Sequence, residues 1–223
     1  MTTAVYDDIT VEVPAGRRQL EASLTVPPDA KGIVLFAHGS GSSRHSPRNR
    51  FVAQHLNNER LATLLLDLLT PAEEEVDART AHLRFNIDLL AARLGQASDW
   101  VHGNPDLREL PIAYFGASTG AAAALVAAAD RPDLVRAIVS RGGRPDLALP
   151  VLGRVTAPVL LIVGENDAPV IRLNRMALQE MLCYRELEIV PRATHLFEEP
   201  GALEQVARLA AQWFGRFLAQ AGA

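Results

Sequence analysis

Ser118, in the pentapeptide Gly116-Ala117-Ser118-Thr119-Gly120, is the residue of this chain best placed for nucleophilic chemistry. A short apolar stretch of strand length precedes the pentapeptide, and an alanine-rich stretch that favours a helix follows it. Strand, Gly-x-Ser-x-Gly and helix together form a nucleophile elbow, a sharp turn that lifts the serine hydroxyl above a sheet. The glycines let the strand and the helix approach without Cβ clashes. The context therefore predicts a catalytic serine rather than an ordinary turn residue.

A serine hydroxyl is a weak nucleophile at neutral pH, so Ser118 needs a base that accepts its proton. Chains that carry this elbow place an acid and then a histidine after the serine. Asp167 and His195 each lie in a loop that follows a later apolar stretch, where α/β sheets build their sites. The other five histidines all precede Ser118. We predict a catalytic triad of Ser118, Asp167 and His195, with Glu165 as the nearest alternative to the aspartate.

The loop after the apolar stretch 32–37 reads His-Gly-Ser-Gly-Ser and lies where an oxyanion hole is needed. Two backbone N–H groups must point at the developing negative charge, and each lowers the barrier by about 3 kcal/mol. One donor is expected from Thr119, the residue after the nucleophile. The second is expected from Ser40, with Gly39 as the next candidate. We expect His38 to brace this loop through hydrogen bonds.

Two groups of arginines lie next to these loops. Arg141 and Arg144 follow one strand, and Arg44 follows the oxyanion loop, with Arg48 and Arg50 close behind it. The planar fork of arginine matches a carboxylate or a phosphate. Arg141, Arg144 and Arg44 are therefore candidate substrate-binding residues, and an anionic acyl substrate is the hypothesis that they support. The alternative is that these arginines cap helices or face solvent.

The elements that must position these residues are predicted by hydrophobic periodicity. Alternation over residues 20–26, with Val11 and Val13 before it, predicts an antiparallel hairpin that turns near Gly16. Continuous apolar runs, typical of parallel strands covered on both faces, then occupy residues 32–37, 61–66, 111–115, 135–139, 159–163 and 187–190.

Helical patterns separate these runs. Thr70-Pro71-Ala72-Glu73 has the form of a capping box with proline at the first helical position. Two apolar stripes at helical spacing follow, formed by Leu83, Ile87, Leu90, Leu94, Ala97 and Val101, and by Leu203, Val206, Leu209, Ala210, Trp213 and Phe217. Strands that alternate with helices after a hairpin predict a three-layer α/β fold with a mostly parallel sheet.

The composition is typical of a globular protein, with 48% hydrophobic and 22% charged residues in a chain of 223. We expect one domain over residues 1–223. The net charge of −4 argues against binding to nucleic acid, and no apolar run is long enough to cross a membrane. The first ten residues lack the pattern of a secretory signal. Cys183, expected in the core, is the single cysteine, which fits a reducing compartment and predicts a cytoplasmic location.

The segments His-Gly-Ser-Gly-Ser, Gly-Ala-Ser-Thr-Gly, Gly-Glu-Asn-Asp and Ala-Thr-His resemble the α/β-hydrolase superfamily, specifically its dienelactone-hydrolase-like branch. The resemblance covers roughly residues 20 to 220. It implies a mostly parallel sheet of about eight strands and hydrolysis of an ester or lactone through an acyl-serine. Dienelactone hydrolases carry a cysteine nucleophile where this chain has Ser118, so their substrate is not transferred. The segment between the strands 135–139 and 159–163 is too short for a cap domain, which predicts an open pocket.

The function that we predict is a serine esterase that cleaves an ester, thioester or lactone of a small acyl substrate. No metal or organic cofactor is implied, and the oligomeric state is left open. A rival of another class is a catalytically silent member of the fold that acts as a binding or scaffold protein. A third reading is a nucleotide-binding fold, because Gly39-x-Gly41 follows a strand and Asp67 ends the next one, although Arg44 stands where the third glycine belongs.

Overall fold

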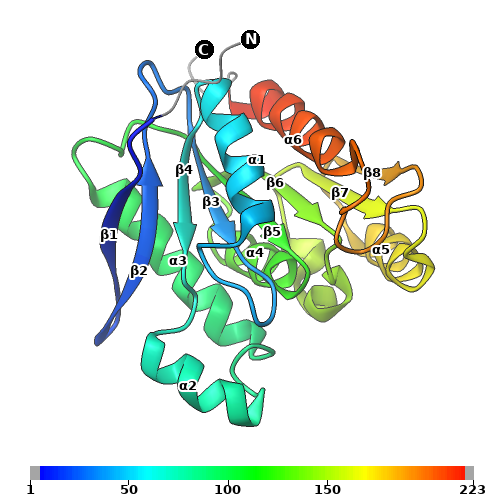
Figure 1. Ribbon diagram of the computed structural model, residues 1–223, viewed down its shortest axis with the longest axis horizontal. Helices are drawn as coiled ribbons and strands as arrows, with labels where there is room; N and C mark the ends of the chain where they lie inside the picture. Colours follow the sequence, from blue (N-terminus) through cyan, green and yellow to red (C-terminus); the bar gives the residue numbers. More distant parts are fainter. Residues whose placement is uncertain (1–5, 219–223) are drawn as a thin grey trace.

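One eight-stranded sheet organises residues 6–218, the part of the chain that the computed structural model describes. Residues 1–5, part of the segment expected to carry no secretory signal, and residues 219–223 lie outside the described residues. The strand order is β1-β2-β4-β3-β5-β6-β7-β8 (Figure 1). The strands are β1 (Ile9–Ala15), β2 (Arg18–Thr25), β3 (Ile33–Ala37), β4 (Ala62–Leu66), β5 (Ile112–Ala117), β6 (Val135–Arg141), β7 (Val159–Gly164) and β8 (Arg185–Val190).

The sheet is antiparallel at its N-terminal edge and parallel elsewhere. β1 pairs with β2, and β2 with β4, in antiparallel register, whereas the six strands from β3 to β8 run parallel. The hairpin turns at Gly16, whose φ of +67° suits a residue without a Cβ. The predicted N-terminal hairpin and mostly parallel sheet are therefore confirmed.

Helices cover both faces of the sheet (Figure 1). α1 and α6 pack on one face against a core that includes Phe36, Phe115 and Phe214, while α3 and α4 pack on the other face against Leu35 and Tyr114. The helices are α1 (Pro47–Asn58), α2 (Pro71–Thr80), α3 (Ile87–Gly103), α4 (Thr119–Asp130), the 3-10 helix η1 (Pro145–Arg154), α5 (Ala168–Glu180) and α6 (Ala202–Leu218). None of the helices between residues 6 and 218 combines the length and apolarity needed to cross a bilayer.

Two sequence predictions about helices can be compared directly with the structure. The segment between β6 and β7 holds only the ten-residue η1, so the described residues contain no cap domain there. The predicted apolar stripe that starts at Leu83 begins too early, since α3 starts only at Ile87. Asp77 explains the difference, since its buried carboxylate accepts the Leu83 backbone N–H at 2.7 Å and holds the chain in a turn.

The predicted capping box at the start of α2 is present and connects to a buried arginine. The Thr70 hydroxyl accepts the Glu73 N–H at 3.4 Å, and the Glu73 carboxylate accepts the Thr70 N–H at 2.9 Å. The other carboxylate oxygen of Glu73 lies 2.7 Å from Nη2 of Arg93, whose side chain is only 5% exposed. Glu73 therefore joins the end of α2 to the buried face of α3.

Replacing Glu73 with glutamine should make the protein less stable in a pH-dependent way. Burial alone would raise the pKa of Glu73, but hydrogen bonds from Arg93 and Thr70 outweigh it and lower the pKa from 4.5 to about 2. The ionised carboxylate therefore stabilises the fold above its unfolded pKa, and this contribution is lost as the pH falls toward the folded pKa. We expect Glu73→Gln to cost on the order of 2 kcal/mol near neutral pH, and much less in acid.

Urea unfolding of both proteins at neutral pH, and at pH values on either side of the ordinary glutamate pKa, measures this difference. The difference in the free energy of unfolding between the wild type and Glu73→Gln should decrease as the pH falls below the ordinary glutamate pKa. A gap of constant size across the series would show that the Glu73 charge does not stabilise the fold.

Candidate active site

Ser118 occupies a strained turn between β5 and α4. Its φ of +51° and ψ of −121° lie in a region that residues with a Cβ seldom adopt, and such strain persists only where neighbouring groups enforce it. The end of β6 supplies that support. The Ser118 N–H donates to the Arg141 carbonyl at 3.2 Å, and the Ser118 carbonyl accepts the Arg144 N–H at 3.1 Å. The turn therefore has the backbone geometry expected of a nucleophile elbow.

The two glycines of the elbow are required by close packing. A Cβ on Gly116 would lie 2.4 Å from Cα of Ala121, at the start of α4. A Cβ on Gly120 would lie 2.2 Å from the carbonyl oxygen of Ala37, at the end of β3. Both distances are too short for any side chain, so β3, β5 and α4 can meet around Ser118 only with glycine at these positions.

The structure brings His195 and Asp167 together. The loop after β7 carries Asp167, the loop after β8 carries His195, and Nδ1 of His195 lies 2.6 Å from Oδ2 of Asp167. Glu165, the alternative acid, instead accepts the Arg192 backbone N–H at 2.7 Å. Because the aspartate occupies Nδ1, the imidazole nitrogen that remains able to take a proton is Nε2.

Gly142 connects the histidine loop with the elbow, and the sequence analysis missed this residue. It follows Arg141, whose carbonyl fixes Ser118, and it adopts a φ of +51°. A Cβ at Gly142 would lie 3.4 Å from Nδ1 and Cε1 of the His195 ring and 3.2 Å from the His195 carbonyl oxygen. Arg141, at the end of β6, thus contacts Ser118, and the next residue, Gly142, lies against His195. The signal in the sequence that could have identified Gly142 is the pair of glycines inside Arg141-Gly142-Gly143-Arg144, a segment that we considered only for its arginines.

The glycine-rich loop after β3 lies against the elbow. A Cβ on Gly39 would lie 3.0 Å from Cβ of Ser118. The Gly39 carbonyl accepts the Ser42 N–H at 3.1 Å, and Gly41 has a φ of +69°, so residues 39–42 form a tight turn with Ser40 exposed. Thr119 begins α4 and is buried. The predicted oxyanion residues therefore lie on both sides of Ser118.

A chain of hydrogen bonds holds this loop from inside the protein. Nδ1 of His38 is 3.0 Å from the Gly39 carbonyl oxygen, and Nε2 of His38 accepts the Leu68 N–H at 3.1 Å. The Leu68 carbonyl in turn accepts a hydrogen bond from Arg93 at 2.6 Å. Burial lowers the pKa of His38 despite the Gly39 carbonyl and the nearby Asp67, so its ring is neutral with the proton on Nδ1. His38 thus braces the loop, and Arg93, a charge beside the apolar stripe of α3, is a support that the sequence analysis missed.

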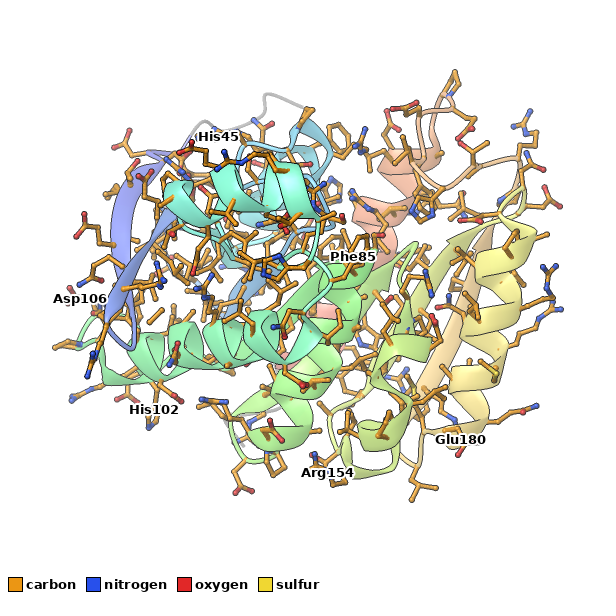
Figure 2. The ribbon with its side chains drawn as sticks, turned by 90° about the horizontal axis from the view of Figure 1, so that it is seen from below. His45, Phe85, His102, Asp106, Arg154 and Glu180 are labelled. Carbon is orange, nitrogen blue, oxygen red and sulfur yellow. The ribbon has the colours of Figure 1, made fainter. Side chains whose placement is uncertain are left out.

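We expect His38→Ala to lower kcat by roughly 10- to 100-fold, because the loop would no longer hold its donor against the oxyanion. KM should change less than kcat, because the donor that the loop holds binds a negative charge that develops only in the transition state. Ester hydrolysis by the folded variant measures both constants. His102→Ala is the matched control, because His102 is exposed at the far end of α3 (Figure 2). An unchanged kcat in His38→Ala, with only its stability reduced, would contradict the positioning role.

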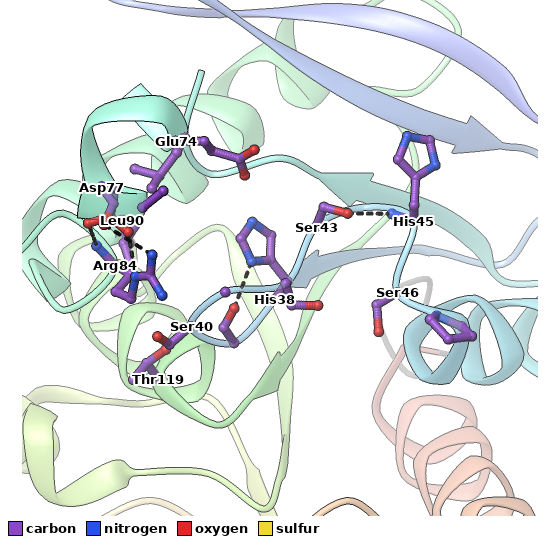
Figure 3. Close-up of a pocket in the computed structure, with 16 residues that line it drawn as sticks. His38, Ser40, Ser43, His45, Ser46, Glu74, Asp77, Arg84, Leu90 and Thr119 are labelled. Carbon is purple, nitrogen blue, oxygen red and sulfur yellow. Dashed lines mark hydrogen bonds and ion pairs between the residues drawn. The ribbon is translucent and has the colours of Figure 1, made fainter. Parts of the chain in front are cut away.

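A pocket of about 490 Å³ opens beside the oxyanion loop. Figure 3 shows His38 and Ser40 on one side of this space, and Glu74 with the ion pair of Asp77 and Arg84 on another. The lining also includes Thr119 but neither Ser118 nor His195. The pocket therefore flanks the elbow without including the Ser118 side chain.

The three candidate arginines differ in their ion pairing. Arg44 pairs with Asp67 and, at 2.7 Å, with Glu21. Arg144 forms two hydrogen bonds of 2.8 Å with the carboxylate of Asp146. Arg141 makes no ion pair with any described residue. Asp67 forms an ion pair with Arg44, so a role for Asp67 as a ribose-binding acid has no structural support.

The chain was compared with family models, curated proteins and solved structures. No family model matches it. Curated proteins from two strains of Mycobacterium tuberculosis, provisionally named phosphoribosyl transferases, are 57% identical over 207 residues. The match covers 93% of this chain and 46% of the relative, so the chain spans about half the length of the curated relatives it matches.

Solved structures match along almost the whole chain. A crystal structure named dienelactone hydrolase, from Anabaena variabilis, is 58% identical with a TM-score of 0.94, and the match covers 95% of this chain and 98% of that one. Est1E from Butyrivibrio proteoclasticus is 16% identical with a TM-score of 0.79, over 95% and 99% of the two chains, which shows the shared fold alone. The high identity to the Anabaena protein confirms the resemblance inferred from the motifs, and the chain belongs to the dienelactone-hydrolase-like family of α/β hydrolases.

Proposed function

We propose that this α/β hydrolase is a serine enzyme that cleaves an ester, thioester or lactone of a small acyl substrate. The observation that carries the proposal is the 2.6 Å contact of His195 with Asp167, on loops beside the strained turn at Ser118. This is the set of groups that acyl transfer requires: a nucleophile, a base and a residue that orients the base.

Acyl transfer proceeds in two halves. Nε2 of His195 removes the proton of the Ser118 hydroxyl as Oγ attacks the carbonyl carbon, and Asp167 stabilises the resulting imidazolium. The Thr119 N–H and the N–H of Ser40 or Gly39 bind the oxyanion. His195 then protonates the leaving group, and the acyl-serine remains. Water activated by His195 attacks this acyl-serine and releases the acid, which restores Ser118.

The substrate is proposed from the site rather than from the names of relatives. The nucleophile position holds serine, so the specific dienelactone in the name of the Anabaena structure is not assigned to this chain. The match covers only 46% of the mycobacterial relatives, so their provisional name is not transferred to this chain. We leave an anionic acyl group out of the proposal, because Arg44 and Arg144 already pair with carboxylates of the chain.

A fluorophosphonate probe tests the nucleophile. Such probes phosphonylate a serine only when a neighbouring base activates it. We expect one probe per protein, located by mass spectrometry on the peptide that contains Ser118, and no label on Ser118→Ala. A folded protein that takes up no probe would instead support the alternative function, a catalytically inactive member of the fold that acts as a binding or scaffold protein.

A further inference from the structure

Arg141 is a buried cation that has no counter-ion among residues 6–218. It ends β6 next to Ala117 in the sheet, and it is only 8% exposed. Its guanidinium carbon lies 5.9 Å from the centre of the Phe115 ring, on the α1 and α6 face of the sheet. Among the described residues its Nη1 has no hydrogen-bond partner. Buried cations are normally paired, because removing a charge from water is costly.

A second arginine, Arg48, adds to the positive charge near Arg141. Burial lowers the pKa of Arg141 to about 10, and the positive charge of Arg48 contributes to the shift, which leaves Arg141 cationic at neutral pH. Arg48 lies in the first turn of α1, and its Nε is also buried without a partner among residues 6–218. Its Nη1 forms a 3.1 Å ion pair with Glu198, a residue of the His195 loop whose side chain is 63% exposed.

The surroundings favour a bound anion at this place. Of the two guanidinium groups only that of Arg48 contacts a carboxylate, the exposed Glu198, and among the described residues each group has a buried N–H without a partner. The N-terminus of the twelve-residue helix α1, capped by Ser46, adds positive potential on the same side. The other arginines near the site differ, since Arg44 and Arg144 are paired with carboxylates of the chain.

We propose that Arg48 and Arg141 bind an oxyanion, the phosphate or carboxylate group of a small ligand, and that this anion replaces Glu198 as the partner of Arg48. Neither arginine lines the pocket of Figure 3, so this anion site is separate from that pocket, and its existence does not depend on the esterase function. The fork geometry of two guanidinium groups suits the planar carboxylate and the tetrahedral phosphate equally.

Calorimetric titration at fixed ionic strength tests the site without any activity readout. Inorganic phosphate and glutarate are the two probes, with chloride as the ionic-strength control. We expect saturable binding of at least one probe to the wild type, and the preferred probe identifies the source of the oxyanion. Arg141→Gln and Arg48→Gln should each weaken that affinity by about 10- to 100-fold. Arg48→Gln keeps the test valid if the buried substitution impairs folding.

Two further variants sharpen the result. Glu198→Gln removes the competing carboxylate and should strengthen binding by about 2- to 5-fold. Arg154→Gln removes the same unit of charge from an exposed position near the C-terminal end of η1 and should leave binding unchanged (Figure 2). No saturable binding by the wild type, or equal weakening by Arg154→Gln, would overturn the site while leaving the proposed esterase untouched.

Discussion

Ser118→Ala should lower the kcat for ester hydrolysis by about 10,000-fold or more, the scale found when a triad serine is removed. No other hydroxyl of the described chain combines an elbow turn with an adjacent histidine loop, so no residue can replace it. The folded state should persist, because alanine keeps the Cβ and the strained backbone is held by the carbonyl of Arg141 and the N–H of Arg144. Steady-state hydrolysis of p-nitrophenyl butyrate measures the change.

Cys183→Ala is the control for this experiment, because family members with a cysteine nucleophile make a thiol the obvious competitor. Cys183 is half-buried beyond α5, and burial raises the pKa of its thiol, which leaves little reactive thiolate. The control should hydrolyse the ester at the wild-type rate. Activity that survives in Ser118→Ala and disappears in Cys183→Ala would assign the chemistry to the thiol.

Asp167→Asn should lower kcat by roughly 1,000- to 10,000-fold while leaving KM nearly unchanged. The carboxylate 2.6 Å from Nδ1 of His195 keeps the proton on that nitrogen, and it stabilises the charge that the ring gains when it takes the serine proton. An amide does neither, and its own N–H can hold the ring in the wrong tautomer. The same p-nitrophenyl ester and a pH profile of kcat measure the loss.

Glu165→Gln is the matched control, since it neutralises a carboxylate in the same loop that accepts the Arg192 N–H rather than the histidine. Its activity should stay within a few-fold of the wild type. If Glu165→Gln proved as inactive as Asp167→Asn, the loss would reflect disturbance of the loop and the assignment of the acid would fall.

The sequence predicts the fold well because its signals are local. Apolar runs identify the parallel strands from β3 onward, although Arg136 interrupts β6 and Glu188 interrupts the half-buried edge strand β8. The capping box at Thr70 identifies the start of α2. The expected order of serine, acid and histidine also selects Asp167, which the structure places against His195. The start of α3 is wrong in the sequence prediction because a side chain six residues away, the Asp77 carboxylate, accepts the Leu83 N–H and holds that segment in a turn, which the helical period does not reveal.

The supports of the site escape sequence analysis because they depend on residues that meet only in the fold. His38 is linked to Arg93 through the backbone of Leu68, and no spacing in the chain marks that path. Gly142 matters because a side chain there would press on His195. The sequence does not reveal ion pairing either, because Arg141 and Arg144 look alike in it. Within the described part of the chain, Arg144 has a carboxylate partner and Arg141 does not.

Trapping the acyl-enzyme tests the central claim most directly. The wild type is mixed with p-nitrophenyl pivalate, whose hindered acyl group slows deacylation, and is quenched in acid during the burst of p-nitrophenol. Proteolysis and mass spectrometry then locate the acyl group. The proposed mechanism predicts one pivaloyl group on the peptide that contains Ser118, formed in proportion to the burst. Release of p-nitrophenol with Ser118 unmodified, or with the acyl group on another residue, would contradict an acyl-serine mechanism.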